Sequence, residues 1–225
     1  MPSLFRFGTL VAISAVLAGC ARSPSGVTPP TVRKMSFEIT FAGPINDAYH
    51  YFIVLDTAGG ITGPTPLFPG VLPGTEGWVI APATHYIEYT GGQYIAYRIT
   101  SLDPPLPPAF VGALLGYIRP EPGSASLSFT ISLDEIGATG DSINVNVIAI
   151  DDPSAPIRLI DGLGLRGMDF VNVDITTDDV VRDADLGDIE GTNDVLDQNQ
   201  QQVPGQPTEQ TRPLDIVDWT ITIDV

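Results

Sequence analysis

Short runs in which apolar and polar residues alternate are the sequence feature that most limits how this chain can fold. The clearest runs are Met35–Phe41, Leu127–Leu133 and Ile143–Val147, in which every second residue is apolar. A period of two places the apolar side chains of an extended strand on one face, whereas a helix needs a period of about 3.6 residues. These runs therefore predict half-buried β-strands.

Seven further segments have strand character, although their alternation is weaker. They are Tyr49–Leu55, Thr84–Tyr89, Tyr94–Ile99, Phe110–Ile118, Ile157–Ile160, Phe170–Ile175 and Ile216–Val225. The chain also contains 21 prolines, which argue against long helices because each removes a backbone donor. We therefore predict about ten strands in an all-β fold, a single antiparallel β-sandwich with long Gly/Pro-rich and acidic loops.

The segment Thr84–Ile99 predicts a hairpin, because Gly91-Gly92 supplies the positive φ angles that a tight turn requires. In a hairpin with a two-residue turn, Tyr89 faces Tyr94 and Tyr86 faces Tyr97, and the two pairs lie on opposite faces. Either one pair lies in the core while the other meets solvent, or both pairs pack structurally.

Two interruptions are long for a compact β domain, whose connections usually span about 2 to 6 residues. Gly59–Gly77 is rich in Gly and Pro and carries apolar residues, so it is either tucked onto the domain or used for binding. Residues 182–212 begin acidic and end in a Gln-rich stretch, which predicts a partly disordered loop.

The N-terminal residues have the order of a secretory signal: Arg6, the apolar run Leu10–Leu17, and then small residues. The run is shorter than the roughly 20 residues of a bilayer-spanning helix. Leu17-Ala18-Gly19-Cys20 resembles the lipobox of bacterial lipoproteins. The resemblance implies that residues 1–19 are cleaved and that Cys20 is lipid-modified at a membrane facing the periplasm or the exterior. The alternative is an ordinary signal peptide with an accidental cysteine.

On this interpretation residues 20–34 are an acylated cysteine with a flexible Ser/Pro/Thr/Gly linker, and residues 35–225 form the β-sandwich domain. Cys20 is the only cysteine, so the mature domain has no disulfide and no thiol chemistry. Without Arg6, nine basic residues face 27 acidic ones, a formal charge of −18. Nucleic acid is therefore not an expected partner.

Few residues are suited to catalysis. The two histidines, His50 and His85, lie inside aromatic strand runs, and no Gly-x-Ser-x-Gly elbow or phosphate-binding loop is present. We expect no enzyme, although a hydrolase is not excluded. Two histidines with 34 residues between them, and no second cysteine, also lack the ligand spacing of a zinc site.

Calcium is the one cofactor that the acidic residues suggest. Eight acidic residues fall within Asp178–Asp197, and the candidate ligands are Asp183, Asp185, Asp188 and Glu190. Such a density of carboxylates repels itself unless it is solvated or neutralised by a cation. The spacing does not match an EF-hand, so the alternatives are calcium bound in an irregular loop and a solvated acidic loop.

Exposed aromatic rings on a sheet can stack on sugar rings. The candidates here are Trp78, Tyr86 and Tyr97, on or just before the predicted hairpin. Two segments, Tyr49–Gly59 and Leu127–Gly137, also resemble the strand-and-turn segments of secreted DOMON-like and CBM9-like β-sandwich modules. That resemblance implies a β-sandwich and sugar binding.

Together these observations predict a membrane-anchored lipoprotein of the bacterial cell envelope that acts as a non-catalytic binding module. Polysaccharide is the expected ligand, and a surface protein is the alternative partner. The competing hypothesis is a calcium-stabilised structural or adhesive surface protein.

Overall fold

The computed structural model describes residues 31–66, 79–80, 82–100, 109–153, 159–164, 169–187, 195–196 and 208–225. Val32–Val225 forms one compact unit, and Met1–Thr31 is divided from it. Cys20, the predicted signal peptide and most of the predicted linker lie outside the described residues.

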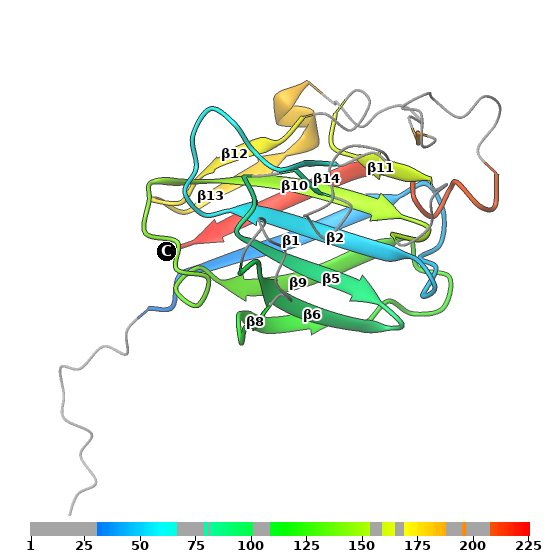
Figure 1. Ribbon diagram of the computed structural model, residues 1–225, viewed down its shortest axis with the longest axis horizontal. Coiled ribbons are helices and arrows are strands. Elements are labelled where there is room, and N and C mark those ends of the chain that lie inside the picture. Colours follow the sequence, from blue (N-terminus) through cyan, green and yellow to red (C-terminus); the bar gives the residue numbers. More distant parts are fainter. Residues whose placement is uncertain are drawn as a thin grey trace, which may run out of the picture. The chain divides into compact units, whose positions relative to one another are not determined.

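Two antiparallel sheets pack against each other, which confirms the predicted β-sandwich (Figure 1). The first sheet has the spatial order β13 (Asp179–Arg182), β14 (Ile216–Asp224), β1 (Lys34–Phe41), β9 (Ser126–Ser132) and β8 (Leu114–Ile118). The second has the order β11 (Ile160–Gly162), β10 (Ser142–Ile150), β2 (His50–Asp56), β5 (His85–Thr90), β6 (Gln93–Arg98) and β7 (Ala109–Phe110), and β12 (Val171–Asp174) also pairs with β10. Strands β3 (Thr65–Pro66) and β4 (Val79–Ile80) form a separate pair.

The sequence prediction recovered the long strands and missed the short ones. Strands β3, β4 and β13 have two to four residues each, too few to show an alternation. The predicted run Phe110–Ile118 is divided into β7 and β8. The predicted loop from Arg182 onward begins with a short 3-10 helix, η2 (Asp183–Leu186), and no α-helix occurs among the residues described.

The core lies between the sheets and consists of the alternating residues identified in the sequence. In β1 the side chains of Met35, Phe37, Ile39 and Phe41 are at most 2% exposed, while the intervening polar residues face outward. Phe37 stacks on Phe129 of β9 with ring centroids 4.9 Å apart. Burial of each such side chain contributes about 1.5–3 kcal/mol, so this layer holds the two sheets together.

The second sheet is also covered on its outer face, because strands β2 and β10 are buried on both sides. Two buried asparagines of β10 hold the covering segments. Asn146 donates to the carbonyls of Pro64 and Asp169, both at 2.8 Å, and accepts from the N–H of Leu163 at 3.2 Å. Asn144 donates to the carbonyl of Thr62 at 2.6 Å. The segment 62–64 of the Gly59–Gly77 loop is therefore held against the sheet, whereas Ile61 is 99% exposed. The loop's other apolar residues, Leu67, Phe68, Val71 and Leu72, lie outside the described residues.

The two ends of the sandwich are formed by different segments of the chain. At one end, which we call the entry end, Lys34 pairs with Ser132 and Asp224, and Arg33 forms an ion pair of 2.9 Å with Asp134. Figure 1 shows the C-terminus and the start of β1 at this end. At the opposite end, the far end, Phe41 pairs with Ile216 and donates to the carbonyl of Ala125. Loops that follow β1 and precede β9 and β14 therefore meet at the far end.

Candidate functional site

The predicted hairpin forms with the expected register. Gly91 and Gly92 have φ angles of +57° and +75°, Tyr86 pairs with Tyr97, and Tyr89 pairs with Tyr94. Tyr89 and Tyr94 lie in the core between the sheets, where burial raises the pKa of Tyr94 to about 12. The inner pair is therefore structural.

The outer tyrosines belong to an aromatic row across the second sheet. The ring of Tyr86 stacks on Tyr97 at 4.8 Å, and Tyr97 lies 5.0 Å from Phe110. Tyr86 is only 4% exposed, so it does not form the exposed stacking surface that the sequence suggested, whereas Tyr97 is half-buried and Phe110 is 75% exposed. Trp78 lies outside the described residues, and its predicted role stays a prediction.

The predicted calcium ligands are only partly covered by the structure. Asp183 is 1% exposed, whereas Asp185 is exposed and its Oδ2 accepts from the N–H of Arg182 at 3.1 Å. Asp188 and Glu190 lie outside the described residues. No group of three or more His, Cys, Asp or Glu side chains suited to a metal ion occurs within the part that the structure describes.

A histidine that activates a serine nucleophile must contact that serine. The two histidines here instead lie within hydrogen-bond distance of Glu88 and Thr84. His50 Nδ1 lies 2.7 Å from Glu88 Oε1 on the outer face of the second sheet, and its ring stacks on Phe52. His85 is 6% exposed, and its Nδ1 lies 3.1 Å from Thr84 Oγ1. Burial, together with the charge of Arg98, lowers the pKa of His85 from its usual 6.5 to about 4.

This shift predicts a pH-dependent stability. As the pH falls from about 6.5 towards 4, the unfolded chain binds a proton at His85 that the folded chain does not bind, so the free energy of unfolding falls. Urea denaturation at about pH 7 and about pH 5 measures this loss, and the variant His85→Gln should lose less stability than the parent chain. Equal losses in the two proteins would contradict the assignment.

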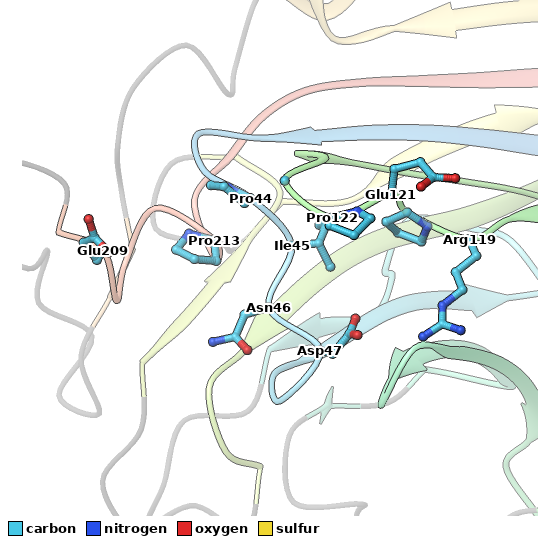
Figure 2. A pocket seen from close by; sticks show the side chains of 11 residues that line it. Pro44, Ile45, Asn46, Asp47, Arg119, Glu121, Pro122, Glu209 and Pro213 are labelled. Atoms are coloured by element: carbon cyan, nitrogen blue, oxygen red, sulfur yellow. The ribbon is translucent and has the colours of Figure 1, made fainter.

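Among the described residues, a cleft lies at the far end of the sandwich (Figure 2). Its volume is about 650 Å³, within the range of small-ligand sites. Three chain segments line it: Pro44–Asp47 after β1, Arg119–Gly123 before β9, and the pair Glu209 and Pro213 before β14. Figure 2 shows Arg119 and Glu121 on one side of the cleft and Glu209 on the other.

Hydroxyl groups of core tyrosines fix the loop that follows β1. The hydroxyl of Tyr51 accepts from the N–H of Asn46 at 3.0 Å, and the hydroxyl of Tyr89 donates to Asp47 Oδ1 at 2.6 Å. Burial and the bond to Asp47 raise the pKa of Tyr89, so the phenol keeps its proton and remains a donor. The N–H of Gly91 also donates to the Asp47 carbonyl at 2.7 Å. The wall of the cleft is therefore held by the core.

Further bonds join the three segments. The guanidinium of Arg212 donates twice to the carbonyl of Ala42, at 3.0 and 2.7 Å, and the N–H of Ile45 donates to the carbonyl of Ser124 at 2.8 Å. Four prolines line the cleft and fix their own φ angles near −65°, which reduces the flexibility of its rim. The site is consequently preorganised, and a ligand loses little affinity in ordering it.

Charged groups in the cleft retain free hydrogen-bonding capacity. Within the described residues, neither the guanidinium of Arg119 nor the carboxylate of Glu121 has an ion-pair partner within 4.0 Å. Arg119 lies over the hairpin turn, where a Cβ on Gly92 would come within 2.5 Å of its Nη2 atom. The glycine thus leaves room for the guanidinium beside the turn.

Sequence reasoning did not identify this cleft. The segments Gly43–Asp47 and Arg119–Gly123 are polar turns interrupted by proline, which is the local signal they carry. Nothing in either segment indicates the other, because the pairing of β1 with β9 and β14 brings them together.

Comparison of the chain with protein-family models, with curated proteins and with solved structures found no match. Among the described residues, no helix has the length and apolar character needed to cross a membrane.

Proposed function

We propose that this protein is a lipid-anchored, extracytoplasmic binding module of the bacterial cell envelope, and that carbohydrate binds in the far-end cleft. The observation that carries the proposal is the preorganised cleft, in which Arg119 and Glu121 have no ionic partner among the described residues. Such groups lose hydration when a ligand covers them, so a suitable ligand must replace those hydrogen bonds.

Carbohydrate fits this set of groups. A sugar presents hydroxyls that both donate and accept, so it can accept from the guanidinium of Arg119 and donate to the carboxylate of Glu121. Its apolar C–H faces can pack on Ile45 and the proline rings that line the cleft. Carboxylates on both sides of the cleft, from Glu121 and Glu209, disfavour a polyanion such as nucleic acid.

The position of the cleft suits a protein tethered at its N-terminus. The chain enters the domain next to Lys34, while the cleft follows Phe41 at the other end of β1. Seven strand steps of roughly 3.3 Å separate these points by about 23 Å. A membrane anchor at Cys20 would thus leave the cleft accessible at the end farthest from the tether junction.

A glycan array probed with the purified chain tests the proposal. We expect retention on at least one class of polysaccharide and about 10- to 100-fold weaker binding by Arg119→Ala, because a hydrogen bond from a charged donor contributes about 1.5–3 kcal/mol. The matched control is Arg182→Ala, which removes another exposed arginine on β13, away from the cleft. Absence of retention, or equal weakening by both variants, would refute the cleft as the ligand site.

A further inference from the structure

One edge of the sandwich exposes large apolar side chains. Phe110 of β7 is 75% exposed, and Leu115, Tyr117 and Ile118 of β8 are 47%, 59% and 69% exposed. Strand β7 is the last strand of the second sheet and β8 is the last strand of the first, so these residues mark the same edge of both sheets. We call this surface the β7–β8 edge. The residue that follows β8, Arg119, also belongs to the proposed ligand cleft.

The backbone of β8 is open on its outer side. In the part of the chain that the structure describes, β8 pairs with β9 and with no other strand. Residues 109–118 contain neither proline nor a charged residue, two of the features by which edge strands avoid pairing with another chain, although the register of β8 against β9 shifts between Leu114 and Gly116. A Cβ on Gly116 would have no atom within 4 Å, so the middle of the strand is accessible.

The charge of this edge differs from that of the rest of the molecule. Between Tyr89 and Pro120 the sequence has one acidic residue, Asp103, which lies outside the described residues, and two arginines, Arg98 and Arg119. The whole chain carries 27 acidic residues and a formal charge of −17. Two copies therefore repel each other through their net charge, and the strands of the β7–β8 edge add no acidic residue to that repulsion.

The open backbone of β8 favours a second strand over a lipid surface as the partner of this edge. A lipid surface would cover the apolar side chains but would leave the outward N–H and C=O groups of β8 without partners, at a cost of several kcal/mol each. A second strand satisfies those groups and covers the side chains together. An identical edge related by a two-fold axis is self-complementary by symmetry.

We propose that two copies of this chain associate through antiparallel pairing of their β8 strands, which joins the two five-stranded sheets into one. In a pairing centred on Gly116, Arg119 of one copy lies opposite Ala113 of the other. The carbonyl of Ala113 accepts from Ser132, which directly precedes the turn that carries Asp134 and Glu135. The arginine of each copy thus lies on the side of its partner that carries this turn, in which Asp134 is ion-paired with Arg33 and Glu135 is exposed.

Cysteine cross-linking of the full chain in its membrane tests this proposal. Gly116→Cys adds a thiol at the position that meets its own copy, where the Cβ atoms of directly opposed residues are about 4.5–5.5 Å apart. A short thiol-to-thiol cross-linker should convert this variant mainly to covalent dimers. The matched control is Val180→Cys, on β13 at the other edge of the same sheet, which should remain monomeric.

A second variant places positive charges on the β7–β8 edge. Leu115→Lys and Ile118→Lys, introduced together into the Gly116→Cys chain, should abolish its cross-linking, because both side chains are exposed and pairing would gather four added positive charges along one strand pair. Val180→Lys in the same chain should leave cross-linking unchanged. Thermal unfolding of each variant establishes that it is folded before cross-linking is compared.

The outcomes separate this proposal from the others. Cross-linking of the parent chain would reveal a free thiol at Cys20 and contradict the lipid anchor without bearing on the edge. A Gly116→Cys variant that stays monomeric would overturn the proposal. Mixed dimers that form only between the Gly116→Cys and Val180→Cys variants would overturn it too, because they indicate head-to-tail assembly. Quenching by brominated lipid of a fluorophore attached to the Gly116→Cys thiol, without cross-linking, would assign the edge to the membrane and overturn it as well.

Discussion

Replacing Cys20 by serine is expected to abolish incorporation of labelled fatty acid into the chain completely. Serine has no thiol, so the thioether that the lipobox resemblance implies cannot form. One acyl chain holds a protein only marginally at a membrane, whereas two or more hold it stably, so loss of the modification removes the anchor as a whole. Growth of cells with labelled palmitate, followed by purification of the chain, measures the effect.

The matched control for this experiment is Ala21→Ser, which introduces the same residue one position later and leaves Leu17–Cys20 intact. It should retain the label, and mass spectrometry should find Cys20 as the modified N-terminal residue. Label that persists in Cys20→Ser, or a wild-type chain with an unmodified Cys20, would refute the lipoprotein assignment. The proposal of a ligand cleft would survive that result, because it depends on the folded domain alone.

Replacing Phe129 by alanine is expected to lower the free energy of unfolding by about 3–5 kcal/mol. Phe129 is 2% exposed and lies at the centre of an aromatic cluster, with ring centroids 4.9 Å from Phe37 and 5.4 Å from Tyr94. Truncation removes buried apolar surface and leaves a cavity that the paired strands β1 and β9 cannot close. Domains of this size are stable by only about 5–15 kcal/mol, so the loss is a large fraction of the total.

Urea denaturation of the parent and variant proteins measures the change. Ile61→Ala is the control, since it truncates a large apolar side chain that is 99% exposed, and its effect should stay within about 0.5 kcal/mol. Similar losses at the two positions would show that Phe129 does not occupy the core between the sheets.

The sequence alone was sufficient to predict the class of fold and most of the long strands. In Met35–Phe41 and Leu127–Leu133 the alternation determines both the extended conformation and the buried face, because successive side chains of a strand point to opposite sides. The Gly91-Gly92 turn likewise determines the register of its hairpin, since a two-residue turn leaves one way to pair the flanking residues. These are short-range properties, which neighbouring residues decide.

Contacts between distant segments of the chain decided the features that the sequence did not predict. The sequence suggested Tyr86 for an exposed strip, but Tyr86 is buried in a cluster on the outer face of the second sheet, to which Ile160 and Leu196 also belong. No alternation indicates which loop will return to cover a sheet.

The cleft and the β7–β8 edge depend on the same kind of information. Asn46, Arg119 and Glu209 meet only because β1 pairs with both β9 and β14, over separations of about 90 and 180 residues. The exposed positions of Leu115 and Ile118 follow from the place of β8 at the end of the sheet order. The sequence by itself determined the strands, one turn and a candidate anchor, because local geometry governs them. The order of the strands in each sheet, which only the tertiary structure contains, decided where a ligand and a second copy can bind.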